Sequence, residues 1–466
     1  MYKKSIFWFR QDLRVQDNTG LFEAVQNSEK ILPIFVLDEH LLEKFWGLGD
    51  LKFGFIREAL DAVSEDLKKI WGEKIIVFKW KPEDLIPKLV QTYNIECIFT
   101  NTSYGMYGKV RDEKVIELVS QLGCKFESHK DFLLVEPHEV EQRKVFTPFY
   151  KLWQKFLQAH PENLRILPPI EKFSQLSSEE QTQAWDFISH EKHPYFTMEF
   201  GKERLEKHIL RNYSDVRNDL DKDGTSRLSP YLRFGIFSVR QVYKQALESF
   251  RELNTTQSGH NGADGSRWAE HYISEMAWRE FWWHILYYFP NTKNQEFQEK
   301  RRHIEWSQDQ EMFQKWCAGK TGYPIVDAAM HQLNETNWMH WRARMVVASF
   351  LTKDMHIDWR LGETYFREKL LDYDEAVNLW NWQWSASVGA DPKPLRVFSP
   401  ILQSEKFDAQ AKYIKKYIPE LEFENLKAIH NPLEIPLSYC PTIVDHRIET
   451  HKARELYKSD DYESTR

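Results

Sequence analysis

Hydrophobic positions in the first 130 residues follow two alternating patterns. Apolar stretches at residues 51–69 and 83–93 repeat with the period of a helix. Between them lie short runs rich in β-branched and aromatic residues, which predict strands at residues 5–9, 31–37, 75–78 and 97–100. Strands that alternate with helices indicate βαβ units, so we expect a parallel sheet covered by helices.

This βαβ pattern would suit a nucleotide-binding fold, but the glycine fingerprint of dinucleotide sites is missing. No GxGxxG follows the first predicted strand, and Gly47, Gly49 and Gly54 have a different spacing and lie beyond the second strand. The sequence therefore does not predict a dinucleotide site in this part of the chain.

The remainder of the chain has a different organisation. Residues 131–200 contain the polar run SQLSSEEQTQ between proline-containing segments, which is typical of a long connection. Helical periodicity then dominates to about residue 408, and a Gly/Asn/Ser-rich stretch at residues 254–266 predicts a loop. We therefore expect an α/β domain over residues 1–130, an interdomain linker over 131–200 and an all-α domain over 201–466.

Composition narrows the class of protein. No stretch of about 18 uncharged apolar residues occurs, and the N-terminus MYKKSIFWFRQDLR reaches charged residues too early for a signal peptide. We therefore expect a cytoplasmic monomer outside the membrane. The four cysteines lack the spacing of zinc ligands, so no metal is predicted. The formal net charge of −7 offers no overall attraction to nucleic acid, so DNA binding would need a local basic surface.

Ordered motifs run along nearly the whole chain. They are WFRQDLRVQDN at residues 8–18, DGTSRLSPYLRFG at 223–235, EMAWREF at 275–281, GKTGYPIVDAAM at 319–330, WMHWRARM at 338–345, ASFLTKDMHIDWR at 348–360, LDYDEAVN at 371–378 and NWQWSASVGAD at 381–391. In this order they resemble the photolyase/cryptochrome family, and most of all its class I photolyases for cyclobutane pyrimidine dimers. The resemblance implies a Rossmann-like antenna domain with a parallel sheet, an all-α C-terminal domain that binds FAD, and a light-driven carbon–carbon lyase that acts on UV-damaged DNA.

The motif at residues 223–235 resembles the flavin-phosphate segment of that family. Hydroxyl and backbone N–H groups of residues 225–229 precede an apolar helical stretch, and a helix N-terminus attracts phosphate. The resemblance implies that FAD contacts Tyr213, Thr225, Ser226, Arg227, Leu228, Ser229, Arg344, Asp372, Asp374 and Asn378. Of these, Asn378 matches the position that faces flavin N5. A neutral amide there can accept a hydrogen bond but cannot supply a proton, which favours a fully reduced flavin.

Three residues of the motif at 275–281 match the lesion site of dimer-specific photolyases. Glu275, Trp278 and Arg279 are spaced to lie on one face of a helix. The resemblance implies that Glu275 hydrogen-bonds the pyrimidine edge and that Trp278 stacks on the flipped lesion. Because a crosslinked dimer is already poorly stacked, extruding it should cost less than flipping normal bases. Glu275 and Trp278, together with Met345, which also matches, and Asn378, form the expected catalytic set.

Trp341 departs from the family pattern. Dimer-specific enzymes usually carry Asn at this position and (6-4) photolyases carry His, whereas an indole cannot replace the paired donor and acceptor of an amide. The neighbouring His340 is a poor substitute because adjacent residues point about 100° apart on a helix. Cyclobutane dimers are the expected lesion, and a (6-4) photolyase or a cryptochrome-type photoreceptor are the alternatives.

The resemblance also implies two further sets of residues. Trp382, Trp359 and Trp306 fall where the family carries its electron-transfer chain from the flavin to the surface, and Trp380 or Trp384 could offer a side route. A DNA-binding surface would comprise Arg217, Glu275, Trp278, Arg279, Trp341, Arg342 and Gln403, with Lys393, Arg396 and Lys406 as further basic residues.

The antenna chromophore is not determined by the sequence. Folate-binding relatives have an acidic residue before an Arg-Asp pair, whereas here Tyr107, Gly108, Lys109 and Val110 precede the pair at residues 111–112. Folate is therefore disfavoured, and a deazaflavin, a second flavin or an empty site remain open.

Overall fold

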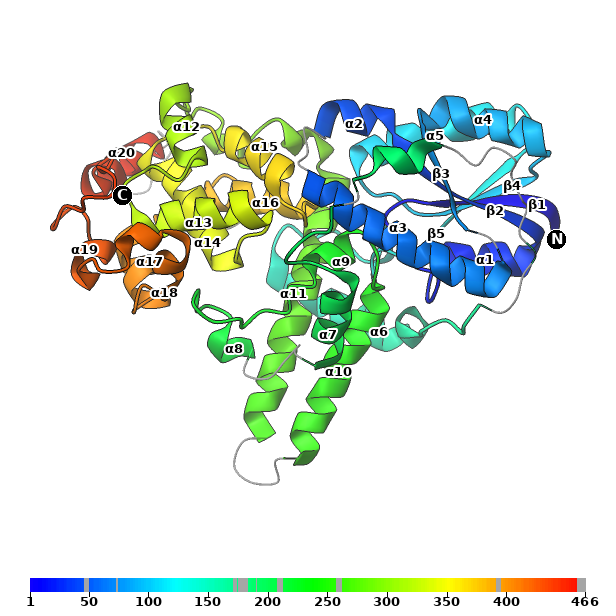
Figure 1. The fold of residues 1–466 in the computed structure, drawn as a ribbon, viewed down its shortest axis with the longest axis horizontal. Coiled ribbons are helices and arrows are strands. Elements are labelled where there is room, and N and C mark those ends of the chain that lie inside the picture. Colours follow the sequence, from blue (N-terminus) through cyan, green and yellow to red (C-terminus); the bar gives the residue numbers. More distant parts are fainter. Residues whose placement is uncertain are drawn as a thin grey trace. The chain divides into compact units, whose positions relative to one another are not determined.

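The computed structural model describes residues 1–45, 50–72, 74–170, 174, 183–189, 191–207, 213–256, 262–390 and 395–458 (Figure 1). The chain forms two compact units, and each is assembled from several segments. The first comprises Met1–Gln142, Thr147–Arg211 and Ser226–Tyr288, and the second comprises Arg143–Phe146, Asn212–Thr225 and Phe289–Arg466.

The first unit is built on a five-stranded sheet. In the order β3-β2-β1-β4-β5, its strands are β3 (Ile76–Trp80), β2 (Ser28–Asp38), β1 (Tyr2–Phe9), β4 (Cys97–Asn101) and β5 (Lys125–His129). Every neighbouring pair is parallel, which confirms the predicted parallel sheet and its first four strands. Strand β5 was not predicted, because its residues KFESH form an edge strand without a hydrophobic run.

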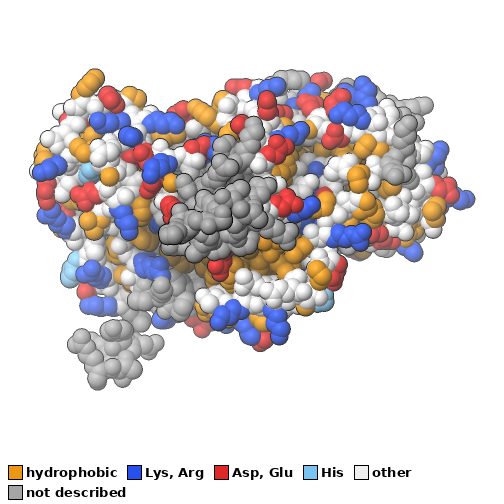
Figure 2. Space-filling view, turned by 90° about the horizontal axis from the view of Figure 1, so that it is seen from below, with side chains coloured by type: hydrophobic (Ala, Val, Ile, Leu, Met, Phe, Trp, Pro, Cys, Tyr) orange, Lys and Arg blue, Asp and Glu red, His pale blue; other side chains and the backbone are white. Residues whose placement is uncertain are grey.

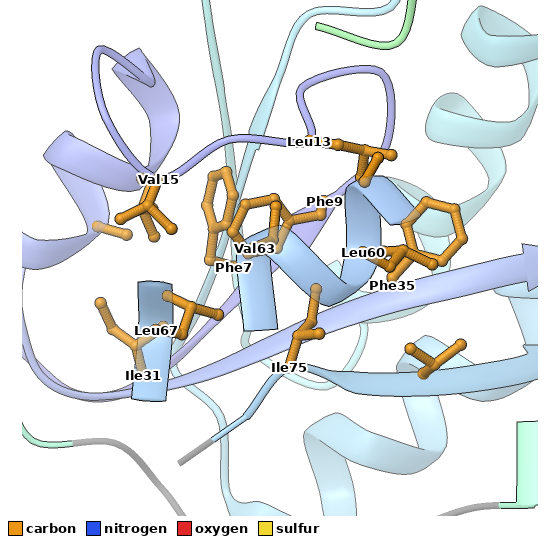
Figure 3. Close-up of a cluster of buried hydrophobic side chains, with 14 of the residues drawn as sticks. Phe7, Phe9, Leu13, Val15, Ile31, Phe35, Leu60, Val63, Leu67 and Ile75 are labelled. Atoms are coloured by element: carbon orange, nitrogen blue, oxygen red, sulfur yellow. The ribbon is translucent and has the colours of Figure 1, made fainter. Parts of the chain in front are cut away.

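Alternating side chains of the strands pack against helices on opposite faces of the sheet. Phe7 and Phe9 of β1 join a buried cluster with α1 (Thr19–Asn27) and α3 (Asp50–Trp71), shown in Figure 3. Ile6 and Trp8 point the other way, into a cluster with α4 (Pro82–Tyr93) and α5 (Met106–Ser120). Both faces are therefore buried, as is usual for parallel sheets.

Buried ion pairs fasten the loop after β1 to one helix and to the segment after β5 in the same unit. Arg14 Nη2 lies 2.5 Å from Asp131 Oδ2, and Arg240 Nη2 lies 2.8 Å from Asp131 Oδ1. Arg240 Nε also lies 3.1 Å from Asp17 Oδ2. All four side chains are buried, and Arg240 belongs to α10 (Val239–Thr256). Much of the motif at residues 8–18 therefore serves the fold, because removing one partner would leave a buried charge uncompensated.

The other helices of the first unit are α2 (Glu39–Phe45), α6 (Phe146–Ala159), α7 (Met198–Lys207), α9 (Ser229–Arg233) and α11 (Gly262–Tyr288). The loop predicted at residues 254–266 is wrong in extent, since α10 continues to Thr256 and α11 already begins at Gly262. A glycine inside a helix costs only about 1 kcal/mol relative to alanine, which a helix of this length can absorb. Residues 257–261 lie outside the described part of the chain.

The described part of the second unit consists of helices and connecting segments, which confirms the predicted helical C-terminal region. Its main helices are α8 (Tyr213–Val216), α12 (Gln310–Cys317), α13 (Pro324–Thr336), α14 (Trp341–Ser349), α15 (Trp359–Lys369), α16 (Glu375–Ser385), α17 (Pro400–Phe407), α18 (Lys412–Tyr417), α19 (Leu426–His430) and α20 (His446–Leu456). Among the helices described in either unit, none has the length and apolar character needed to cross a membrane.

Candidate functional site

In the first unit, helix α11 presents the predicted lesion-binding residues. Glu275, Trp278 and Arg279 are all partly exposed, and the indole of Trp278 packs against Trp282 with ring centroids 5.2 Å apart. Arg279 donates from Nη1 to the Phe132 carbonyl at 3.1 Å, and its guanidinium lies 3.9 Å from the centre of the Phe132 ring. Arg279 is therefore partly committed to contacts within the protein.

Glu280, which the sequence analysis did not single out, fixes this helix from its buried side. Its Oε1 accepts the Leu134 N–H at 2.5 Å, and its Oε2 accepts the Trp153 indole N–H at 2.7 Å. Burial raises the pKa of this carboxyl although the hydrogen bonds oppose the shift. Glu280 thus sets the rotation of α11 and with it the direction of the neighbouring Glu275 and Trp278.

The phosphate-binding candidates lie beside the same helix. Arg227 has φ of 52°, a left-handed conformation that is uncommon for a residue other than glycine and occurs often at functional sites. Tyr272, one turn before Glu275 on α11, donates from its hydroxyl to Ser226 Oγ at 3.2 Å. Leu228 immediately precedes α9, which begins at Ser229. The structure therefore brings residues 226–229 to the face of α11 that carries Glu275.

In the second unit, Arg344 and Asp372 form a close ion pair. Arg344 Nη2 lies 2.8 Å from Asp372 Oδ2 and 3.1 Å from Oδ1, while its Nε donates to the Met339 carbonyl at 2.8 Å. The Asp372 side chain is almost fully buried, whereas that of Arg344 is 26% exposed. The guanidinium is therefore held in a fixed orientation with one side open to a ligand.

Asp374 and Asn378 lie at the start of α16. Asp374 caps this helix by accepting the Val377 N–H at 3.0 Å. Asn378 donates from Nδ2 to both the main-chain oxygen and Oε1 of Glu363, at 3.1 and 3.0 Å. Because both of these bonds use the amide nitrogen, the amide oxygen is turned away from Glu363. Burial raises the pKa of Glu363.

The three tryptophans of the predicted electron-transfer chain differ in their exposure to solvent. Trp382 and Trp359 are buried, and Trp306 is partly exposed. Helix α15 starts at Trp359, and a Cβ placed on its Gly362 would come within 2.2 Å of the Trp382 ring. The missing side chain of Gly362 thus lets Trp382 lie directly against the helix that carries Trp359.

Trp341 is held between two arginines of the predicted DNA-binding surface. Its indole N–H donates to the Arg217 carbonyl at 2.7 Å, and the guanidinium carbons of Arg217 and Arg342 lie 4.6 and 4.2 Å from the ring centre. Arg342 also donates to the Asn218 amide oxygen at 2.5 Å and to Met345 Sδ at 3.6 Å. His340 is buried and caps α14 with its ring, so it does not replace the missing amide.

The other DNA-binding candidates that the structure describes lie on α17 and in the segment before it. Gln403 and Lys406 lie one turn apart on α17, and the Leu220 N–H donates to the Phe407 carbonyl at 2.9 Å, which joins this helix to the segment carrying Arg217. Arg396 instead lies 5.1 Å from the centre of the Trp384 ring. Lys393 lies outside the described residues. On the face shown in Figure 2, basic and acidic side chains are interspersed.

A pocket lies at the carboxyl ends of β1, β2 and β4 in the first unit. The pocket is partly open to solvent, and its lining includes Arg10, Asp38, Phe35, Asn101 and Arg111. β1 and β4 are neighbours in the sheet, and the chain leaves β1 towards β2 on one side and β4 towards β5 on the other; such switch points are the usual ligand sites of parallel sheets.

Comparison with known proteins decides the family. Residues 5–169 match the family described as DNA photolyase, and residues 272–459 match the FAD binding domain of DNA photolyase. A deoxyribodipyrimidine photo-lyase of Synechococcus sp. is 34% identical, over 97% of this chain and 96% of its own length. The chain belongs to the DNA photolyase family.

Solved photolyase structures share the fold along the whole chain. An archaeal photolyase from Sulfolobus tokodaii with two FAD molecules has a TM-score of 0.83 and 30% identity, covering 97% of this chain and 99% of that protein. A cryptochrome from Synechocystis sp. has a TM-score of 0.84 and covers 98% of this chain and 99% of its own, but at 24% identity it shows the fold alone.

The structure adds residues to the photolyase site that the sequence analysis missed. Glu280 is buried and Glu363 is partly buried; these carboxylates orient α11 and Asn378, and neither stands out in sequence among the 70 acidic residues. The pocket at the strand ends was missed because its lining residues are distant in sequence. The available signal was a polar residue directly after a predicted strand, as with Asp38 and Asn101.

Proposed function

We propose that this protein splits cyclobutane pyrimidine dimers in DNA with light, and that it does so with FAD in its helical C-terminal region. Bound FAD in its reduced and excited form supplies one electron to the dimer and takes it back after the ring has opened. The observation that carries the proposal is the orientation of Asn378. Its amide nitrogen is used by Glu363, so its oxygen is free to accept a hydrogen bond from a reduced flavin N5.

The chemistry of the available groups fits FAD. Arg344 offers a guanidinium fixed by Asp372 and partly open, which suits the polar edge of the isoalloxazine ring. Asp374, Tyr213 and Thr225 are further proposed contacts in the second unit. In the first unit, residues 226–229 offer hydroxyl and backbone N–H groups to a pyrophosphate. Recovery of FAD after denaturation of the purified protein supports this proposal, and recovery of FMN alone contradicts it.

Three residues are proposed to act on the lesion. Glu275 hydrogen-bonds the dimer and stabilises the negative charge that develops on it, because charge-assisted hydrogen bonds are stronger than neutral ones. Trp278 stacks on the extruded bases, and Met345 packs against them. Arg217, Trp341, Arg342 and Gln403 bind the flanking DNA, with Arg279, Arg396, Lys393 and Lys406 as additional basic residues.

A repair assay with defined oligonucleotides tests the assignment. Duplexes carrying one cyclobutane dimer or one (6-4) product are incubated with chemically reduced protein, illuminated, and analysed for restored pyrimidines. We expect repair of the dimer only. Repair of the (6-4) product alone would overturn the lesion assignment, and repair of neither by FAD-loaded protein would favour a cryptochrome-type photoreceptor. The protein is further proposed to act as a cytoplasmic monomer without a metal.

A second chromophore is proposed for the pocket at the strand ends. The pocket lies at the usual ligand position of a parallel sheet, and the Sulfolobus tokodaii photolyase structure contains two FAD molecules. Arg10 and Arg111 lie 5.1 and 4.7 Å from the Trp8 ring centre, so the pocket combines cationic and aromatic groups. A deazaflavin or a second flavin would suit this lining. The stoichiometry of chromophores released from purified protein distinguishes them from an empty site.

A further inference from the structure

A buried carboxylate links the two outer tryptophans of the proposed electron-transfer chain. Glu296 is only 6% exposed. Its Oε1 accepts the indole N–H of Trp306 at 3.0 Å and that of Trp359 at 3.3 Å. Two aromatic N–H groups thus converge on a single carboxylate oxygen, so one anion faces both indoles.

Arg360 contacts the same carboxylate but is not placed symmetrically between the indoles. Its Nη2 donates to Glu296 Oε1 at 2.9 Å, and its guanidinium carbon lies 4.6 Å from the centre of the Trp359 ring. Its Nη1 is 3.0 Å from Asp358 Oδ1, which fixes the guanidinium further. The cation therefore lies over the ring of Trp359, while the carboxylate receives the N–H of both tryptophans.

Glu296 remains charged in spite of its burial. Burial raises the pKa of this carboxyl, but the Trp306 hydrogen bond and the charge of Arg360, among other contacts, outweigh that effect and leave the pKa lowered. A buried carboxylate with a lowered pKa is ionised at neutral pH, so the indoles face a full negative charge at short range. Charges interact more strongly in the protein interior than in water because the effective dielectric constant is lower there.

We propose that Glu296 and Arg360 draw the positive charge left by photo-oxidation outward, from Trp359 to Trp306. The carboxylate stabilises a positive charge on either indole, whereas the guanidinium disfavours that charge on Trp359. Glu296 and Arg360 are thus positioning residues for charge, and they separate it from the flavin. This inference rests on the proposed FAD site and on the proposed roles of the three tryptophans.

Oxidised flavin, when bound and excited, would accept one electron. Trp382 supplies this electron, Trp359 replaces the electron of Trp382, and Trp306 replaces that of Trp359. Trp306 is left as an indole radical cation with its proton still on Nε1, hydrogen-bonded to Glu296, and no bond is formed or broken. A thiol in solution then returns one electron to Trp306 and is itself oxidised.

The lifetime of the tryptophan radical tests the inference without a repair assay. Full-length protein with oxidised FAD is excited by a short flash in the absence of thiol, and the absorption of the radical cation is followed until the electron returns. In Glu296→Gln the charge loses its stabilisation at both Trp306 and Trp359, so on average it lies closer to the flavin, on Trp382. We expect its decay to be at least about tenfold faster, which corresponds to about 1.4 kcal/mol. Arg360→Met should accelerate the decay in the same direction.

Matched controls separate this inference from folding and from the proposed route. Glu299→Gln removes the same charge three residues away, from a side chain that is 85% exposed, and should decay like the unmodified protein. Repair by chemically reduced protein should be equal in all variants, because it does not use the electron-transfer chain of Trp306, Trp359 and Trp382. If Trp306→Phe leaves photoreduction unchanged, the route itself is wrong. If Trp306→Phe removes the long-lived radical but Glu296→Gln and Arg360→Met decay like the unmodified protein, only the inference about charge is refuted.

Discussion

Replacing Trp341 by Asn tests whether its indole braces the proposed DNA-binding surface. Asn is the residue that dimer-specific photolyases usually carry here, so sequence reasoning alone predicts that Trp341→Asn leaves dimer repair similar or improved. The structure leads to a different expectation. The indole N–H holds the Arg217 carbonyl at 2.7 Å, and its ring contacts the guanidinium groups of Arg217 and Arg342. An Asn side chain is too short to keep all of these contacts.

The size of the effect follows from the contacts that are lost. A neutral hydrogen bond contributes about 1 kcal/mol, and each cation–π contact at a partly exposed site contributes about 0.5 to 1 kcal/mol. Together they predict a fall of about 2 to 3 kcal/mol in the free energy of unfolding of the second unit. If half of that stabilisation positions the two arginines for phosphate, the affinity for dimer-containing DNA should fall by about tenfold.

Urea unfolding followed by far-UV circular dichroism measures the free energy of unfolding. Equilibrium binding to a dimer-containing duplex at fixed salt measures the affinity for DNA. Trp341→Phe is the closest control, because it keeps an aromatic ring for the two guanidinium groups while removing the N–H with the five-membered part of the indole, and should cost at least about 1 kcal/mol. If Trp341→Asn changes stability by less than about 0.5 kcal/mol and binds DNA as tightly as the unmodified protein, the bracing role is refuted. If it abolishes repair with DNA binding intact, the lesion pocket is built around the indole.

Five other substitutions have definite expected outcomes. Trp306→Phe or Trp382→Phe should block photoreduction of oxidised flavin, measured by absorbance under steady light with thiol, and leave repair by pre-reduced protein nearly intact. Glu275→Ala should lower the repair yield, because it loses a contact worth about 1.5 to 3 kcal/mol. Trp278→Ala should instead weaken dimer binding first, by about 1 to 3 kcal/mol. If both substitutions change affinity and yield equally, the two residues do not have separate roles. Burial raises the pKa of Asp131, but two arginine charges outweigh it and hold the pKa at about 2. The contribution of the Asp131 carboxylate to the free energy of unfolding should be complete above its unfolded-state pKa of about 3.9, and it should be lost as the pH falls towards 2. If Asp131→Asn and the unmodified protein unfold at the same acid pH, this prediction is wrong.

The fold could be predicted from sequence where hydrophobic patterns are strong. Strands β1 to β4 and helices α3 and α4 follow from uninterrupted apolar runs or clear helical periodicity, because both faces of the sheet are buried. Strand β5 lies at the edge with three of its five side chains partly buried and the other two exposed, so its sequence carries no such run. The ends of α10 and α11 were misjudged because glycine and asparagine weaken helix propensity without preventing a long helix.

The candidate site was predicted from ordered motifs rather than from patterning. Motifs name the residues but not their partners. The sequence gives no reason to connect Asn378 with Glu363, or Trp306 and Trp359 with Glu296, since these partners lie 10 to 63 positions apart. Partners of this kind are determined by helix packing, and the residue type alone does not distinguish a buried glutamate from an exposed one. Their contribution becomes visible only when burial and hydrogen bonds are known.

The acidic composition of the chain does not conflict with a DNA-binding function. Screening limits exposed charges to a range of about 8 Å at physiological ionic strength, so a phosphate responds to its nearest side chains rather than to a net charge of −7. Burial and the neighbouring Arg217 lower the pKa of Arg342 to about 10, which shows that two like charges are held together in a poorly solvated place. Arg342 donates to the Asn218 amide and to Met345 sulfur, both of them neutral. A phosphate bound beside these arginines would relieve their repulsion, so DNA binding at the proposed surface would offset the free energy that holding them together costs.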